Sequence, residues 1–382
     1  MFADDGVVLE CGNCTENSLL RSRYDLGEFR PLPGAGPTRY RNWLPIIRSV
    51  PSPNVTTVFP GHELGRALGL SNLWIAFTGY WPERDCYAES FSFKELEAIT
   101  VLGRRPAGDT PLIVGSAGNT ASALALWCTN MSVPCILVVP ARQLERLALA
   151  TPFGPSVEII GLDSPRYSDA LVHAETLRTR YGVPAEGGVR NVARRDGMAT
   201  VVYSAFEALG RLPDYYVQAV GSASGALAAY EAALRLPGEP APRLVLCQHA
   251  DFAPVHRHWT DTWTDTLCPP NISTPELTTI TPPYSQAGGI AEVLRRSRGS
   301  VEVASESERF VAAAVFEQTY GIDIEPPAAI ALAGLKNAVD RKAVEPDALI
   351  LLNITGGGRK HRMKGPDHVG RVRHSIVSGH TT

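Results

Sequence analysis

The sequence predicts an α/β fold built on parallel β-strands. Six short apolar runs, rich in β-branched residues, precede helical segments, and four of them stop directly at Gly or Pro; the six span 111–114, 135–139, 157–160, 216–220, 244–247 and 349–352. Strands that are apolar at nearly every position suit a parallel sheet covered on both faces. The helical segments between them indicate βαβ units.

Two of these runs are followed by a glycine-containing turn and then by a helix of small apolar residues. The turn at 116–120 precedes the helical segment 121–127, and the loop at 221–226 precedes the segment 226–234. Strand, tight turn and helix start in this order aim backbone N–H groups and a partial positive charge at an anion. Because ligands of such sheets bind at the carboxyl ends of the strands, both turns are expected at a binding site.

Length and composition favour an enzyme-sized globular protein with two domains. The chain has 382 residues, of which 44% are hydrophobic and 20% charged. A formal net charge of -3 gives no basic face for nucleic acid. The acidic N-terminus and the absence of an apolar run near the roughly 20 residues of a membrane span predict no membrane association and a cytoplasmic protein. Proline-rich stretches at 31–60 and 236–283 are interpreted as loops.

The seven cysteines are too scattered for a disulfide framework. Cys11 and Cys14 form a single Cys-x-x-Cys pair, whereas structural zinc requires four ligands and no second pair follows nearby. A plain turn is the favoured interpretation, with a zinc site and redox activity as alternatives. No metal site is therefore predicted.

The Ser/Gly loops favour a single phosphate monoester over a nucleotide. Neither turn fits the P-loop pattern, and the 221–226 loop departs from Gly-x-Gly-x-x-Gly, which disfavours a nicotinamide enzyme. Hydroxyl and N–H donors can wrap one phosphate group. Lys94, in the run 89–96, supplies an amine that could condense with an aldehyde cofactor held by such a cradle.

Three motifs in this order resemble the tryptophan-synthase-like, fold type II pyridoxal-phosphate enzymes, the family that includes threonine synthase and cysteine synthase. Ser92-Phe93-Lys94 resembles the family's Schiff-base motif, the 116–120 turn its Ser-x-Gly-Asn-Thr loop, and the 221–226 loop its phosphate cup. Longer strings extend the similarity over nearly the whole chain; they lie at 39–45, 72–77, 191–198 and 352–358.

The resemblance implies a tryptophan synthase β-like architecture, with two doubly wound open-sheet domains and pyridoxal 5'-phosphate in the cleft. A small mobile domain at 91–205 would pack on a large domain built from 1–90 and 206–358. The segment 359–382 would form a basic, flexible tail. Members of the family commonly form homodimers, so a homodimer is expected.

The resemblance also implies roles for single residues. Lys94 would form the Schiff base and act as the base at the substrate Cα, Asn119 would bind the cofactor ring oxygen, and Thr355 would face the pyridine nitrogen. The cofactor phosphate would lie in the cup formed by Gly221, Ser222, Ala223, Ser224 and Gly225. The substrate would be held by Ser116, Ala117, Gly118 and Thr120 at its carboxylate, and by Arg194 and Arg195 at its phosphate.

The sequence around Arg194 departs from the family pattern Asn-Pro-x-Arg-x-x-Gly-Gln, because both the proline and the glutamine are replaced. A guanidinium still matches phosphate oxygens and would stabilise a leaving phosphate. The alternative is that Arg194 or Arg195 pairs with Asp196 or another acid.

The implied reaction is β-replacement, in which sulfite replaces the phosphate of O-phosphoserine and cysteate is formed. Two enzymatic alternatives remain open: threonine synthase activity on O-phosphohomoserine, and β-replacement with a thiol or another small nucleophile. One methylene or one oxygen is distinguished by pocket shape, which the sequence does not reveal. A cofactor-free ligand-binding relative is disfavoured because Lys94 and Asn119 are both present.

Overall fold

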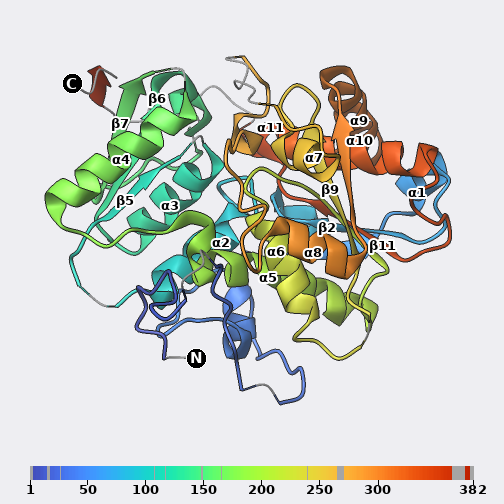
Figure 1. The fold of residues 1–382 in the computed structure, drawn as a ribbon, viewed down its shortest axis with the longest axis horizontal. Coiled ribbons are helices and arrows are strands. Elements are labelled where there is room, and N and C mark those ends of the chain that lie inside the picture. The colour runs from blue at the N-terminus through green and yellow to red at the C-terminus, as the bar shows by residue number, and fades with distance from the viewer. Residues whose placement is uncertain are drawn as a thin grey trace.

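The structure is a computed structural model that describes residues 3–14, 18–25, 27–106, 108–116, 118–147, 149–164, 166–238, 240–264, 271–363 and 375–378. Two open sheets lie side by side, each with helices packed on it (Figure 1). The larger sheet contains, in spatial order, β1 (Thr57–Pro60), β2 (Leu73–Phe77), β11 (Ile350–Ile354), β8 (Tyr215–Ala219), β9 (Arg243–His249) and β10 (Ser300–Ala304). Its strands pair in parallel except for β1, which is antiparallel to β2.

The smaller sheet is parallel throughout. It contains, in spatial order, β12 (Ser375–Ser378), β7 (Val157–Asp163), β6 (Cys135–Pro140) and β5 (Leu112–Gly115). All six predicted strands are therefore present, within three residues of their expected bounds. A separate ribbon pairs β3 (Tyr80–Trp81) with β4 (Cys86–Tyr87).

Helices of the small-sheet half include α2 (Lys94–Arg104), α3 (Asn119–Asn130) and α4 (Tyr167–Tyr181). Those of the large-sheet half include α1 (His62–Leu68), α5 (Val192–Leu209), α6 (Ser224–Ala233), α7 (Pro254–Trp259), α8 (Ile290–Ser297), α9 (Glu306–Tyr320), α10 (Pro326–Asp340) and α11 (Arg359–Arg362). Short 3-10 helices are η1 (Pro37–Trp43), η2 (Pro82–Arg84), η3 (Ala141–Leu147), η4 (Gly188–Arg190) and η5 (Pro275–Leu277).

Three features differ from the sequence prediction. The stretch 31–60 is not only loop, because it forms η1 and β1, and the buried Tyr40 and Trp43 of η1 join the core. The stretch 236–283 likewise contains α7 and η5. The strand β12 pairs with β7, so part of the predicted flexible tail adds a strand to the small sheet. The remainder of the tail, 364–374 and 379–382, lies outside the described residues.

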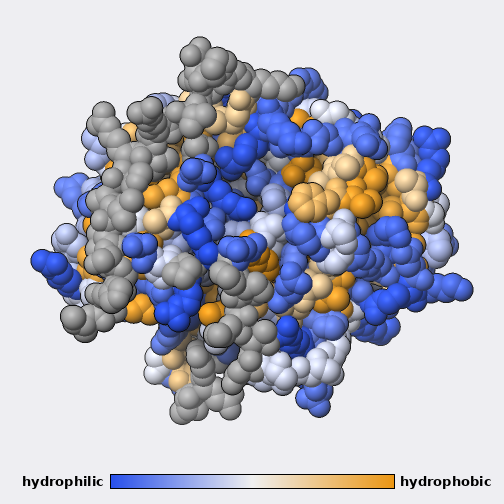
Figure 2. All heavy atoms as spheres, turned by 90° about the horizontal axis from the view of Figure 1, so that it is seen from above, coloured by the Kyte–Doolittle hydropathy of each residue, from blue (hydrophilic) through white to orange (hydrophobic). Residues whose placement is uncertain are grey.

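Cys11 and Cys14 lie in a turn near the N-terminus. The backbone N–H of Cys14 donates to the carbonyl of Cys11 at 3.3 Å, which closes a turn. Among the described residues, no three His, Cys, Asp or Glu side chains cluster as metal ligands would, and no helix has the length and apolar character of a membrane span. Hydrophilic side chains cover much of the face in Figure 2, and hydrophobic residues gather on its right-hand half.

Helix α2 lies between the two sheets and contacts α3 on one side and α5 on the other (Figure 1). Gly197 of α5 permits the second contact. A Cβ atom at this position would lie 2.7 Å from Oγ1 of Thr100 and would overlap the carbonyl oxygen of Leu96, both in α2. Close approach of the two helices therefore depends on a missing side chain, and this contact fixes the distance from α5 to the helix that begins at Lys94.

We expect Gly197→Ala to destabilise the protein by about 2 kcal/mol, because the added methyl group forces α2 and α5 apart. Urea unfolding would measure the loss. Gly27→Ala is the control, since no atom lies within 4 Å of a Cβ at Gly27. Equal midpoints for Gly197→Ala and the wild type would contradict this account of the contact.

Candidate active site

The predicted site segments lie at the carboxyl ends of strands in both sheets. Residues 221–225 follow β8 and Thr355 follows β11, and these two strands are parallel neighbours in the large sheet. The 116–120 turn follows β5 of the small sheet. The predicted site residues of both sheets therefore follow the carboxyl ends of strands, where ligands of such sheets bind.

The segment that ends in Lys94 is hydrogen-bonded to the turn that carries Thr355. The N–H of Phe93 donates to the carbonyl of Thr355 at 2.9 Å, and the N–H of Gly357 donates to the carbonyl of Phe91 at 3.0 Å. Lys94 is the first residue of α2, and its side chain is 22% exposed. The backbone therefore fixes Lys94 beside Thr355, while the side chain keeps access to solvent.

Residues 221–225 form a cup of backbone groups and hydroxyls at the start of α6. Ala223 is in the left-handed region with φ 59°, and the hydroxyls of Ser222 and Ser224 lie 2.8 Å apart. A Cβ atom at Gly225 would lie 2.9 Å from the ring of Phe93. The cup thus leaves no room for a side chain at Gly225 and lies directly against the segment that carries Lys94.

The 116–120 turn is shaped by its own serine. The hydroxyl oxygen of Ser116 accepts hydrogen bonds from the N–H groups of Gly118 at 3.2 Å and Ala121 at 3.1 Å. Helix α3 then begins at Asn119. Ala117 lies outside the described residues. The turn therefore places Asn119 and Thr120 in the first turn of a helix, where backbone N–H groups are free to bind an anion.

Sequence reasoning missed Glu97, a buried carboxylate on which three predicted site residues converge. Its Oε2 lies 2.7 Å from Nζ of Lys94, and its Oε1 lies 2.7 Å from Nη1 of Arg194. The hydroxyl of Thr120 donates to Oε1 at 3.3 Å. A signal was present in the sequence, since Glu97 lies one helical turn after Lys94 and faces the same side of a helix.

Arg194 is held by two carboxylates rather than exposed to a ligand. Besides Glu97 it contacts Glu186, with its Nε 2.6 Å from Glu186 Oε1, and its side chain is 11% exposed. Burial alone would lower the pKa of Arg194, but the two carboxylates raise it above its ordinary value. Its charge is already balanced, so phosphate binding by Arg194 requires one of these carboxylates to give way.

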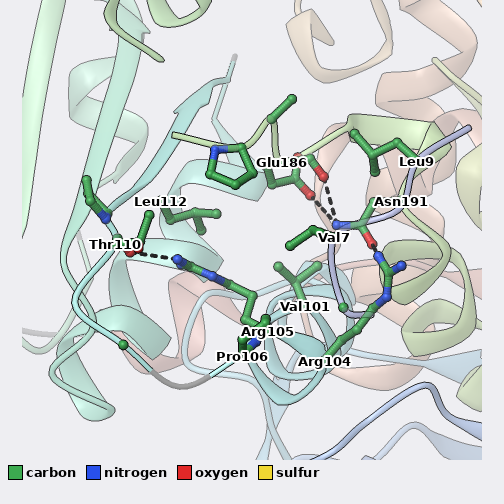
Figure 3. Close-up of a pocket in the computed structure, with 15 residues that line it drawn as sticks. Val7, Leu9, Val101, Arg104, Arg105, Pro106, Thr110, Leu112, Glu186 and Asn191 are labelled. Carbon is green, nitrogen blue, oxygen red and sulfur yellow. Dashed lines mark hydrogen bonds between the residues drawn. The ribbon is translucent and has the colours of Figure 1, made fainter. Parts of the chain in front are cut away.

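Glu186 and Asn191 extend these contacts to the far end of α2. Asn191 Nδ2 donates to Oε1 of Glu186 at 3.2 Å, and Nη1 of Arg104 donates to Oδ1 of Asn191 at 3.0 Å. Figure 3 shows Glu186, Asn191 and Arg104 along one side of a pocket, with Arg105 reaching the carbonyl of Thr110. Polar contacts therefore run from Lys94 at one end of α2 to Arg104 at the other.

Arg195 does not join this cluster. Its side chain is fully buried, lies 3.5 Å from Glu231 and donates to the backbone carbonyls of Val189 and Leu20. Arg195 is therefore not a substrate ligand but an arginine paired with an acid, the alternative considered above. The acid is Glu231, not the neighbouring Asp196. Arg195 thus ties α5 to α6 and to the N-terminal segment.

Glu276 of η5 lies against both glycine turns and was also not predicted. A Cβ at Gly118 would lie 3.5 Å from its Oε1, and a Cβ at Gly221 would lie 3.0 Å from its carbonyl oxygen. Nη1 of Arg146, in η3 after β6, lies 2.6 Å from the same Oε1. This ion pair joins the two sheets beside the predicted site.

Residues 66–356 match the protein family described as pyridoxal-phosphate dependent enzyme. Among curated proteins, the chain is 37% identical over 375 residues to cysteate synthase of Methanocella paludicola, covering 93% of this chain and 86% of that protein. It is 40% identical over 343 residues to cysteate synthase of Methanocorpusculum labreanum, covering 86% and 83%.

Solved structures show the same fold at low sequence identity. Maize serine racemase aligns with a TM-score of 0.62 and 16% identity, covering 79% of this chain and 89% of that one. Threonine synthase from Escherichia coli aligns with a TM-score of 0.60 and 13% identity, covering 83% and 80%. The predicted fold class is confirmed.

Glu95, next to Lys94, is a second buried carboxylate of α2. It accepts hydrogen bonds from the N–H of Ser90 and from Nε1 of Trp127, the latter at 3.2 Å. Burial raises the pKa of Glu95 from 4.5 to about 7, against the lowering effect of these hydrogen bonds. The folded state therefore binds a proton at Glu95 more tightly than the unfolded state does.

Glu95 should make the protein less stable as the pH rises. A raised folded-state pKa gives stability that is present below pH 4.5 and is lost as the pH rises to about 7. Glu95→Gln removes this loss, so the unfolding free energy of the variant relative to the wild type should increase by about 3 kcal/mol between pH 5 and pH 8. Urea unfolding at both pH values measures it, with exposed Glu63→Gln as control; a difference that does not change with pH would contradict the assignment.

Proposed function

The chain belongs to the family of pyridoxal-phosphate dependent enzymes, and we propose that it exchanges the phosphate of O-phosphoserine for sulfite to form cysteate. The family match and the relatives confirm the predicted family, the enzyme class and the cofactor, pyridoxal 5'-phosphate. The shared name of relatives that are 37% and 40% identical supports pyridoxal-phosphate-dependent formation of cysteate. Replacing phosphate by sulfite at Cβ of O-phosphoserine yields this product, so we propose these two substrates.

The convergence of four loops around Lys94 is the observation that supports the proposed site. Phe93 is hydrogen-bonded to Thr355 and packs against Gly225, and Lys94 shares the carboxylate of Glu97 with Thr120. These contacts bring a lysine amine, a hydroxyl-lined cup and a helix start from two sheets to one place.

The residues present fit the cofactor. The cup at 221–225 offers N–H groups, two hydroxyls and the start of α6 to the cofactor phosphate, and a Cβ at Gly225 would clash with Gln218 and with the ring of Phe93 that packs beside it. The hydroxyl of Ser92 is buried without a partner among the described residues, so this region has an unsatisfied polar group of its own. Asn119 would bind the ring oxygen, Thr355 would face the pyridine nitrogen and Lys94 would bond to the aldehyde carbon.

Bound pyridoxal phosphate withdraws electrons from Cα of the amino acid attached to it, which makes loss of the Cα proton and of a β-substituent feasible. The residues of the chain supply the rest. Lys94 would take the proton from Cα and later return it, because its amine is the basic group beside the cofactor. Gly118 and Thr120, at the start of α3, would hold the substrate carboxylate with N–H and hydroxyl donors.

Arg194 would bind the departing phosphate after releasing Glu97 or Glu186. Its guanidinium could then donate hydrogen bonds to two phosphate oxygens and stabilise the negative charge that develops on the leaving group. Substrate binding would also close the small-sheet half on the large-sheet half, at the edge where the Arg146 and Glu276 pair links η3 to η5. Closure would exclude water from the reacting atoms.

The homodimer and the cytoplasmic location remain predictions.

Purified protein loaded with pyridoxal phosphate should release phosphate from O-phosphoserine and form cysteate when sulfite is present. Lys94→Ala should lower the rate about a thousandfold or more, because the proposed base at Cα is removed. Phosphate assay and mass spectrometry of the amino-acid product measure both. Parallel assays with O-phosphohomoserine, and with a thiol in place of sulfite, test the two alternative reactions.

The control is Lys336→Ala, which removes a lysine that is paired with Asp340 on the exposed face of α10. It should leave the rate unchanged. A higher rate with O-phosphohomoserine than with O-phosphoserine would show that the proposed phospho-amino acid is wrong. A higher rate with a thiol than with sulfite would show that the proposed nucleophile is wrong. Full activity in Lys94→Ala would overturn the site itself.

A further inference from the structure

Glu97 divides its two carboxylate oxygens between different cations. Oε2 receives the Lys94 ammonium at 2.7 Å, whereas Oε1 receives Arg194 at 2.7 Å and the Thr120 hydroxyl at 3.3 Å. The side chain is 1% exposed. Every strong contact of this carboxylate is therefore with a residue of the proposed site.

A buried carboxylate at this position is stable only as an anion with partners. Burial alone would raise the pKa of Glu97, but Arg194 and Lys94 beside it lower it below its ordinary value. Taking a carboxylate out of water costs several kcal/mol, which good pairing must offset. Arg194 and Thr120 contact Oε1 while Lys94 contacts Oε2, so Glu97 still has partners when the lysine alone moves away.

Lys94 cannot donate to Glu97 as an ammonium ion and be bonded to the cofactor at the same time. When the bond forms, the amine nitrogen joins the aldehyde carbon through a double bond, and the carbonyl oxygen leaves as water. Two of the three ammonium protons leave in that water and one stays on nitrogen, so the charge is unchanged and nothing is oxidised or reduced. A proton must leave the ammonium ion before its nitrogen can attack.

We propose that Glu97 is a positioning residue that holds the amine of Lys94 whenever this amine is not bonded to the cofactor. The inference rests on the proposed role of Lys94. Glu97 Oε2 is then the resting place of the lysine in the cofactor-free protein, and during turnover it receives the ammonium ion that forms once the displaced lysine has taken the Cα proton.

This arrangement predicts effects of opposite sign for the two partners of Glu97. Glu97→Gln removes the charge that holds the ammonium ion, so formation of the bond to the cofactor should become faster. Arg194→Gln removes the cation that shares Glu97, so Oε2 should hold Lys94 more tightly and bond formation should become slower. A residue that served only to stabilise the fold would slow the reaction in both variants.

The test is the rate at which cofactor-free protein takes up pyridoxal phosphate at pH 7, followed by visible absorption in a stopped-flow instrument. Glu97→Gln should raise this rate on the order of tenfold and Arg194→Gln should lower it by a similar factor, which is less than the effect of breaking a fully buried pair because the Lys94 side chain is 22% exposed. Glu95→Gln is the matched control, because Glu95 is equally buried in α2 but contacts Ser90 and Trp127 instead of Lys94.

Circular dichroism of each cofactor-free variant establishes that it is folded, and if Glu97→Gln does not fold, the slowed uptake of Arg194→Gln still tests the inference. A Glu97→Gln rate equal to or below that of the wild type would overturn it, as would faster uptake in Arg194→Gln. Lys94→Ala separates the two claims. An absorption change that persists in Lys94→Ala would overturn the proposed role of Lys94, whereas its loss there with no change in Glu97→Gln would overturn the role of Glu97 alone.

Discussion

The carboxylate of Glu97 is the contact on which the arrangement of the proposed site depends. It joins Lys94 of α2, Thr120 of α3 and Arg194 of α5, three separate helices of the chain. Charges this deeply buried are tolerated only when each is paired. The pairing therefore fixes how the three helices meet, and it fixes where the lysine amine lies.

The same constraint extends along α2 to its far end. Arg194 contacts Glu186, Glu186 contacts Asn191, and Asn191 accepts a hydrogen bond from Arg104, the last residue of α2. Arg104 also donates to Asp4, so the N-terminal segment is part of the same network. Gly197 lets α2 and α5 pack closely, and this packing keeps the residues of the network within contact distance. A change at either end of α2 is thus felt at the amine of Lys94, through contacts between rigid helices.

The parts of the site that depend on local sequence could be predicted, and the parts that depend on distant pairing could not. Apolar runs between glycine turns identified β5, β8 and β11, and with them the ends of the strands at which ligands bind. The identity of each partner of Arg194 could not be read in this way, because Glu97 lies 97 residues earlier in the chain and Glu186 lies in a separate loop. The two adjacent arginines of α5 illustrate the same limit: they look equivalent in sequence, yet helical geometry turns Arg194 toward Glu97 and Arg195 toward Glu231. Strand β12 was missed for a similar reason, since its only pairing is with β7, more than 200 residues away.

A crystal structure of the protein grown with pyridoxal phosphate tests the central claim most directly. The account predicts continuous electron density from Nζ of Lys94 to the cofactor, cofactor phosphate in the cup at 221–225, and Glu97 still within hydrogen-bonding distance of Arg194 and Thr120. Density that joins the cofactor to another residue, or a Glu97 side chain turned away from Arg194, would contradict it.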